Sequence, residues 1–516
     1  MKTIKKCLRT SSFLFRGSSF ILFLLFNLFL QAQTIRFNKT YIEENPLTLN
    51  VVALDTGYVV AGTGNDGRYY ILINGTDLQG NLRWVKRYKN SGYHTYSGAQ
   101  NSLIKTLDGG FALAGSKPGL GFRSGYFMKF DDSFDTLWTK TYLTDTNFIA
   151  FYNCTQTNDS CYVLVGEKGV NSNDSKFVLV KINTEGDTLW SKYYGGNSFE
   201  TGFKVINTKT NDLLAGGKTF SFCSLSTGYC GEWYIIRTDS AGNLNWENHY
   251  GNPNYDDGPV HSIINLKDSG FLVSGLKVTG LNGSTSLYKG RIIRFNKNME
   301  IVWDKLYFNQ SEMTDIGIIV ELQNGDFATV GYESNSYSTH NRPLLFKLNS
   351  SGDIIWKREI LAPNVDTTFT GGFHTLSTTN DGGYILTGNA YINDPINYNQ
   401  IWLVKTDSMG CDGFNPCDTT TVSNDLQITP PLADYELIIY PNPAEENILI
   451  AAQSTEENFQ NAIVTVVDLT GKPVLTEPIE KNTNYHQLNI SSIKQGLYFV
   501  KIQGKNFVYS GRFMKY

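Results

Sequence analysis

Three acidic residues at matching places in successive repeats are the strongest candidates for chemistry in this sequence. Each stands shortly before a glycine and an expected β-strand, in Glu200-Thr201-Gly202, Asp256-Asp257-Gly258 and Asp315-Ile316-Gly317. If the repeats surround an axis, Glu200, Asp256 and Asp315 ring the mouth of a central channel. Converging carboxylates can bind a hard cation such as Ca²⁺, and a pair at the right separation can cleave a glycosidic bond. A plainer interpretation is that they accept hydrogen bonds from backbone amides at the turn into each strand.

Other motifs that could carry chemistry are weaker. His261 follows Asp256 closely, but no Ser or Cys nucleophile stands beside it in a recognisable motif. The sequence has no phosphate-binding loop and no dinucleotide-binding glycine pattern. Aromatic residues that could stack on sugars lie in expected connections between repeats: Tyr93, Tyr96, Tyr255 and Phe369. We therefore expect no catalytic residues and no cofactor, with Ca²⁺ as the one ion that the acidic residues would suit.

A segment of about fifty residues repeats along most of the chain. In the clearest copy, an Asp108-Gly109 turn leads into an alternating run that ends at Gly115, and further β-runs follow at 126–130 and 136–142. Asp-Gly turns favour hairpins because glycine adopts positive φ at little cost. The last run of each copy carries a tryptophan, at intervals of 54, 52, 56, 57 and 53 residues: Trp84, Trp138, Trp190, Trp246, Trp303 and Trp356. This period in strand-like segments predicts a propeller or a solenoid.

The strand count distinguishes these two architectures. Seven sets of inner strands occur, but only six have a fourth strand with tryptophan, and the seventh set ends near Cys411. The opening segment 34–41 resembles a lone fourth strand with Phe37 in the tryptophan position. A strand from one end that completes the last sheet at the other end closes a ring and protects its edges. We therefore predict an all-β fold with a seven-bladed β-propeller over residues 34–417.

The N-terminal residues predict export. Five basic residues precede an apolar run at 20–30, which is the order of a secretory signal: Lys2, Lys5, Lys6, Arg9 and Arg16. The apolar run is shorter than the ~20 residues that span a membrane, so we expect a signal peptide over 1–33 and no transmembrane anchor in the mature chain. Loss of these five charges takes the formal net charge from −4 to −9. Such an acidic protein is a poor candidate for nucleic-acid binding.

The six cysteines that follow the predicted signal peptide fall into three close pairs. In an exported chain, close pairs predict local disulfides, here Cys154 with Cys161, Cys223 with Cys230, and Cys411 with Cys417. No histidine accompanies them at zinc-finger spacing, so a metal site is the weaker interpretation. The first pair shares one expected hairpin, and its two cysteines need not lie opposite each other.

The C-terminal part has a different pattern. Polar residues and prolines at 418–435 predict a linker, and short β-runs at 436–516 predict a small β-sandwich. Three motifs follow in order: Tyr440-Pro441-Asn442-Pro443, a turn with Gly471-Lys472, and a run that begins with Gly496 and contains Tyr498. Together they resemble the type A C-terminal sorting domain of type IX secretion substrates. That resemblance implies an immunoglobulin-like sandwich recognised by the outer-membrane translocon.

These features together predict a protein that is secreted or displayed on the outer-membrane surface. Long and varied loops gather on one expected face of the propeller, where binding sites usually lie. We expect a non-catalytic module that binds a glycan or a surface protein. The alternatives are a polysaccharide lyase or glycosidase that uses the channel-mouth carboxylates, and a structural envelope or adhesion protein.

Overall fold

The described residues form β-strands as their only regular elements. The computed structural model describes residues 35–42, 46–90, 93–118, 123–142, 148–171, 174–222, 230–252, 255–282, 285–307, 312–335, 341–363, 370–391, 399–415, 417, 435–452, 459, 462–468, 472–479, 485–504 and 508–516. The predicted signal peptide lies outside them, and so does the predicted linker as far as residue 434. The chain divides into two compact units, Met1–Ser423 and Asn424–Tyr516.

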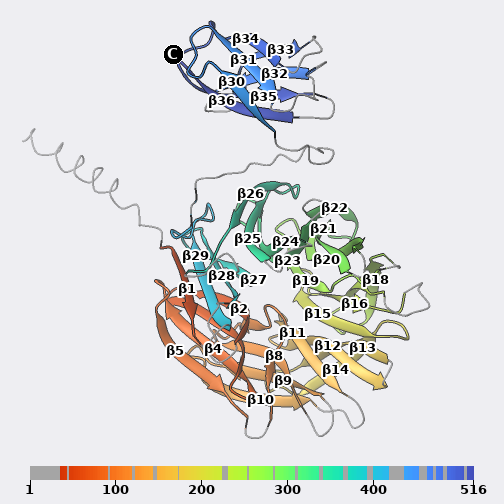
Figure 1. The fold of residues 1–516 in the computed structure, drawn as a ribbon. Helices are drawn as coiled ribbons and strands as arrows, with labels where there is room; N and C mark the ends of the chain where they lie inside the picture. Colours follow the sequence, from red (N-terminus) through yellow and green to blue (C-terminus); the bar gives the residue numbers. More distant parts are fainter. Residues whose placement is uncertain are drawn as a thin grey trace, which may run out of the picture. The chain divides into compact units, whose positions relative to one another are not determined.

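Unit 1 consists, within the described residues, of seven antiparallel sheets, which we number sheet 1 to sheet 7 in chain order (Figure 1). Sheet 1 contains β2 (Leu47–Leu54), β3 (Gly57–Asn65), β4 (Tyr69–Asp77) and β5 (Leu82–Tyr88). Sheet 2 contains β6 (Tyr96–Ser97), β7 (Leu103–Lys105), β8 (Phe111–Pro118), β9 (Arg123–Phe130) and β10 (Thr136–Tyr142). Sheet 3 contains β11 (Ile149–Gln156), β12 (Tyr162–Asn171), β13 (Asp174–Ile182) and β14 (Thr188–Tyr194). Sheets 4 and 5 contain β15 (Glu200–Asn207), β16 (Leu213–Thr219), β17 (Glu232–Thr238) and β18 (Leu244–Tyr250); β19 (Val260–Asn265), β20 (Phe271–Asn282), β21 (Thr285–Phe295) and β22 (Ile301–Tyr307). Sheets 6 and 7 contain β23 (Glu312–Glu321), β24 (Phe327–Asn335), β25 (Asn341–Leu348) and β26 (Ile354–Glu359); β27 (Thr370–Thr378), β28 (Tyr384–Tyr391), β29 (Asn399–Thr406) and β1 (Phe37–Tyr41).

Sheet 7 takes its outer strand from the other end of the unit. β1 pairs with β29 in antiparallel register, with Phe37 opposite Lys405 and Tyr41 opposite Ile401. The pairing confirms that the opening segment supplies the strand missing after β29. Trp402 donates a hydrogen bond from its indole Nε1 to Asn38 Oδ1 at 2.8 Å, so a side-chain contact also holds the added strand.

The core of unit 1 lies between its sheets. Seven buried clusters of the described residues each join two neighbouring sheets, and one of them joins sheet 7 back to sheet 1. In that last cluster Phe37 of β1 packs with Tyr58 of β3 and Leu403 of β29. Figure 1 shows the resulting ring, in which six of the first strands lie toward the centre: β2, β11, β15, β19, β23 and β27. Every sheet is therefore covered by two others, which explains why the inner strands are apolar on both faces.

Glycine turns and β-bulges recur at matching places in the sheets of unit 1. Gly109, Gly325 and Gly382 have φ of 87°, 85° and 79° in the turns before β8, β24 and β28. Positive φ is easy for glycine, so the Asp-Gly and Asn-Gly signals give the tight hairpins that they predict. A recurring register shift interrupts the first strand, for example between Gly202 and Lys204 of β15. Such bulges add twist and redirect one side chain.

The C-terminal unit forms one seven-stranded sheet among the described residues, in which β30 changes partner along its length. Tyr435 and Glu436 pair with the last strand, whereas Leu437 to Tyr440 pair with β31. We call the two resulting parts layer A and layer B. Layer A contains β32 (Ala462–Val467), β33 (Pro473–Ile479), β35 (Gly496–Gln503) and β36 (Val508–Lys515), and layer B contains β30 (Tyr435–Tyr440), β31 (Asn447–Ala452) and β34 (Tyr485–Asn489).

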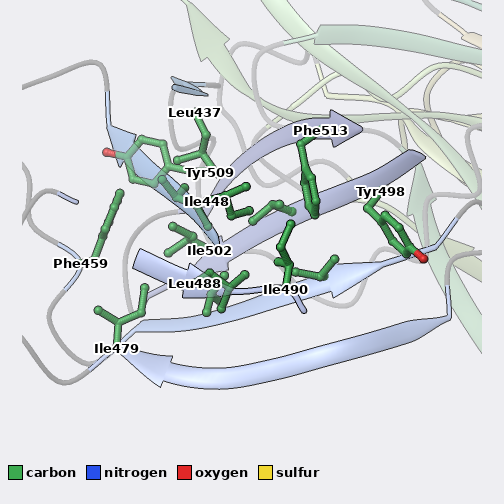
Figure 2. Close-up of a cluster of buried hydrophobic side chains, with 14 of the residues drawn as sticks. Leu437, Ile448, Phe459, Ile479, Leu488, Ile490, Tyr498, Ile502, Tyr509 and Phe513 are labelled. Carbon is green, nitrogen blue, oxygen red and sulfur yellow. The ribbon is translucent and has the colours of Figure 1, made fainter. Parts of the chain in front are cut away.

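Side chains from both layers meet in one buried cluster (Figure 2). Ile448 and Leu488 come from layer B, and Ile502 and Phe513 come from layer A. Alternation along β31 is strict, since Ile448 and Ile450 are buried and Leu449 between them is exposed. This period of two is typical of a sheet that buries one face and exposes the other.

The cysteine predictions have mixed outcomes. Cys411 and Cys417 form a disulfide with a Cα–Cα distance of 5.6 Å, as predicted. Cys230 is disulfide-bonded, while its expected partner Cys223 lies outside the described residues. The predicted bond between Cys154 and Cys161 is wrong, because both are free. Cys154 lies opposite Leu164 in the ladder rather than opposite Cys161, so the hairpin register keeps the two thiols apart.

Candidate functional site

Glu200 is enclosed in sheet 4 rather than exposed at a channel mouth. It begins β15, is completely buried, and its Oε1 accepts hydrogen bonds from Thr219 Oγ1 at 3.1 Å and from the Ser221 hydroxyl. Burial raises the pKa of Glu200, and the two hydroxyl donors oppose that rise. The side chain therefore holds the start of the connection after β16 against β15.

Asp256 and Asp315 have different partners from Glu200 and from each other. Asp256 is exposed, and its Oδ1 lies 2.6 Å from Lys218 Nζ. Asp315 Oδ1 lies 3.2 Å from His261 Nδ1 on the neighbouring first strand. Burial lowers the pKa of His261, but the Asp315 carboxylate and the Ile316 carbonyl together outweigh burial, so the pKa is raised. The described residues contain no group of three or more His, Cys, Asp or Glu side chains that could hold a metal, so these three carboxylates do not form one set of ligands.

Asp257, which the sequence did not single out, is the buried member of the Asp-Asp pair. It is completely buried, its amide donates to Gly231 O at 2.9 Å, and its Oδ1 accepts from the Val278 amide. Burial raises the pKa of Asp257 to about 6. The carboxylate thus links the turn before β19 to β20, both in sheet 5. A signal in the sequence was the glycine directly after it, which marks a turn where an acidic side chain can bind backbone amides.

The raised pKa of Asp257 gives a pH-dependent prediction. The folded state holds its proton up to a pH of about 6, whereas the ordinary pKa is 3.8, so folding binds a proton between these values and stability falls as the pH rises through them. We expect Asp257→Asn to remove this fall and to raise the free energy of unfolding at pH 7.5 by up to about 3 kcal/mol. Urea denaturation of the wild-type protein and the variant at pH 4 to 8 measures this free energy of unfolding.

The neighbouring Asp256→Asn is the matched control. It breaks an ion pair in which the Asp256 side chain is 50% exposed, so its expected effect is below about 1 kcal/mol across this pH range. Equal pH profiles for the two variants would contradict the assignment of the raised pKa to Asp257.

Polar side chains also occupy the first strands near the centre of the ring. Lys204 on β15 is 5% exposed, and its Nζ has no hydrogen-bond partner among the described residues. Burial lowers the pKa of Lys204 to about 7 and also lowers the pKa of His374 on β27. Burial raises the pKa of the Cys154 thiol to about 12, which keeps it protonated and unreactive. In each of these groups burial favours the neutral form over the charged form.

A cavity of about 420 Å³ lies where sheets 4, 5 and 6 meet. Three sheets contribute to its walls: Lys218 from β16, Leu276 and Tyr288 from β20 and β21, Thr314 and Tyr332 from β23 and β24, together with Asp256, Gly258 and Ser334. The volume is in the usual range for small-ligand sites. Two half-buried tyrosine rings, an ion pair and two hydroxyls combine apolar faces with hydrogen-bonding groups. We call this hollow the sheet 4–6 cavity.

A second hollow, of about 580 Å³, lies on sheet 1 and includes Tyr69 and Tyr93. Tyr96 packs against Tyr69 with ring centroids 4.8 Å apart, so two of the aromatic residues noted in the sequence gather here. Tyr255 lies in the connection before sheet 5, and Phe369 lies outside the described residues. The sheet 4–6 cavity could not be found in the sequence, because its walls come from segments that are far apart in the chain.

The first sorting motif is bound to the end of the last strand. Asn442 accepts a hydrogen bond at Oδ1 from the Met514 amide at 2.9 Å and donates from Nδ2 to Arg512 O at 3.2 Å. Tyr440 and Pro441 are exposed beside it, and so is Pro443. The Asn side chain thus fixes the proline turn against β36.

The other two motifs stabilise the C-terminal unit. The Tyr498 hydroxyl donates to Lys494 O at 2.8 Å, and its ring stacks on Phe513 at 5.7 Å. Gly496 begins β35. Lys472 closes a turn through its amide, which donates to Asp468 Oδ1 at 3.1 Å, and Gly471 lies outside the described residues.

Solved structures that resemble the chain do so at low sequence identity. PorZ, an essential bacterial surface component of the type-IX secretion system of Porphyromonas gingivalis, is 10% identical, with 93% of this chain and 70% of that chain covered and a TM-score of 0.30. Puromycin hydrolase is 11% identical, with 79% and 58% covered and a TM-score of 0.45. A mutant of the NanB sialidase from Streptococcus pneumoniae is 10% identical, with 73% and 70% covered and a TM-score of 0.37. No curated protein matches the sequence.

A family model matches the C-terminal part of the chain. It describes a secretion system C-terminal sorting domain and covers residues 438–515, which include all three motifs. The described residues contain no helix that is long and apolar enough to cross a membrane. The C-terminal unit is therefore a secretion system C-terminal sorting domain, which confirms the resemblance of the three motifs and marks the chain as a type IX secretion substrate.

Proposed function

We propose that this type IX substrate is a secreted or surface-attached binding protein. In this proposal unit 1 is a seven-bladed β-propeller that binds a glycan or a surface protein without catalysis, and the C-terminal unit is an immunoglobulin-like sandwich. The seven inter-sheet clusters and the pairing of β1 with β29 support the propeller. The two layers with one shared core support the sandwich.

The sheet 4–6 cavity is the observation that carries the binding function. A sugar ring has apolar C–H faces and polar edges, and the cavity offers both kinds of contact. Tyr288 and Tyr332 supply aromatic faces, while the Lys218–Asp256 pair supplies a donor and an acceptor at the wall. A glycan is therefore the ligand that we favour over a protein.

The three candidate carboxylates each have a polar neighbour of their own, and this supports binding over catalysis. A glycosidase needs one carboxylic acid and one carboxylate that face the same bond. Glu200 is enclosed by hydroxyl groups, Asp256 is paired with Lys218, and Asp315 lies beside His261. Each of them therefore lies against a different neighbouring side chain, and they do not face one common bond.

Removal of an aromatic wall tests the proposal. We expect Tyr288→Ala to weaken glycan binding about ten- to hundredfold, because an aromatic contact in a binding pocket contributes about 1.4–2.8 kcal/mol. Binding of the purified full-length protein to a glycan array would identify the ligand, and titration calorimetry would give the affinity.

Tyr193→Ala is the matched control, since this tyrosine is 48% exposed on β14 of sheet 3 and does not line the cavity. Equal losses in the two variants, or no glycan binding by the wild-type protein, would overturn the glycan proposal. Cleavage of the bound glycan by the wild-type protein would favour an enzyme instead.

A further inference from the structure

The outward face of layer B in the C-terminal unit is apolar. Ile438, Tyr440 and Leu449 are 52%, 72% and 40% exposed on neighbouring strands. Tyr440 lies directly opposite Leu449, and Ile438 lies opposite Ala451. Directly opposite residues point to the same side of a sheet, so these side chains form one continuous surface. The surface continues to Tyr485 on β34, which pairs with Ala451.

Where β30, β31 and β34 pair with one another, over 437–440, 447–452 and 485–489, no charged residue shares this face. The remaining positions of the same alternation are Asn447, Gln487 and Asn489. The outward face of layer A differs, since Lys501 on β35 is exposed there and Arg512 lies opposite Phe499. A soluble domain rarely exposes a contiguous apolar patch unless the patch contacts something. Layer A also exposes apolar side chains, such as Ile463, Phe499 and Met514, but charged residues lie among them. The uncharged character of the layer B face therefore requires a specific explanation.

The sorting motif belongs to this surface. Tyr440 is its first residue and the most exposed member of the face. Asn442 anchors the following turn to β36, so the turn has a fixed position at the edge of the face. An anchored turn beside a rigid apolar sheet can be recognised with little loss of conformational entropy.

We propose that the layer B face, defined by Ile438, Tyr440, Leu449, Ala451 and Tyr485, docks on an uncharged apolar surface of the type IX export machinery. The family of the C-terminal unit gives the occupant, because a secretion system sorting domain exists to be engaged by that system. The continuity of the face with the motif turn gives the location. Burial of the large apolar side chains supplies the affinity, and the absence of charges avoids a desolvation cost.

Charge introduced into the face tests this proposal. The double variant Ile438→Lys/Leu449→Lys, in the full chain and in a host with an active type IX system, is expected to lose at least about tenfold of its surface-exposed or released protein, a change that corresponds to about 1.4 kcal/mol of binding free energy. The missing protein should accumulate in the periplasm. Both positions are exposed, so the unit should remain folded, and hydrogen exchange of β35 and β36 checks this. The conservative variant Leu449→Met is expected to be exported normally.

Ile463→Lys is the matched control, because Ile463 is 50% exposed on β32 of the other layer. Normal export of the double variant would overturn the proposal. Equal loss in the control would also overturn it, since export would then respond to any added charge. Light scattering tests a second copy of this chain as the occupant: a wild-type dimer that becomes monomeric in a normally exported double variant would assign the face to self-association instead.

Discussion

Replacement of Phe513 with alanine is expected to destabilise the C-terminal unit by about 3–5 kcal/mol and to prevent export. Phe513 is 1% exposed and packs on Tyr498. It lies on β36, which pairs with both β35 and β30 and so joins layer A to layer B. A domain of this size has a stability of only about 4–12 kcal/mol. Loss of one large core side chain therefore removes much of that stability.

Hydrogen exchange and an export assay measure these two effects. All eight tryptophans lie in unit 1, so tryptophan fluorescence would not report on the C-terminal unit. Exchange of peptides from β35 and β36 reports on it directly. Met514→Ala is the control, because Met514 is the next residue and is 40% exposed. Export of Phe513→Ala at the level of Met514→Ala would show that recognition does not require the folded C-terminal unit.

Replacement of Phe37 with alanine is expected to lower the free energy of unfolding of unit 1 by about 3–5 kcal/mol. Phe37 is 8% exposed, and its ring centroid lies 5.8 Å from that of Tyr58 on sheet 1. Its ring also covers Gly80, where a Cβ atom would lie 2.6 Å from the Phe37 ring. One side chain on β1 thus holds sheet 7 against sheet 1, where the two ends of unit 1 meet.

Urea denaturation followed by tryptophan fluorescence measures this change without interference from the C-terminal unit. The adjacent Arg36→Ala is the control, since it removes an ion pair with Asp407 in which the arginine side chain is 41% exposed. Such pairs contribute at most about 1 kcal/mol. Similar midpoints for the two variants would mean that packing of Phe37 does not hold the closure together.

The repeats, the added strand and the sorting motifs could be predicted because short-range chemistry determines them. A glycine at a turn followed by an alternating run specifies a hairpin wherever it occurs, as Asp108-Gly109 and Asp381-Gly382 illustrate. The absence of a fourth strand after β29 is evident when the expected strands are counted along the sequence. The pairing of Phe37 with Lys405 confirms it across most of the chain.

The site depended on tertiary structure. Sequence alone did not distinguish Asp256 from Asp257, but the packing of β20 against the turn buries only Asp257. It placed Cys154 near Cys161, whereas the ladder sets Cys154 opposite Leu164. The cavity walls and the layer B face likewise consist of residues brought together by strand pairing. Local propensity determines which strands form, whereas burial, partners and pKa are properties of neighbours that only the folded chain supplies.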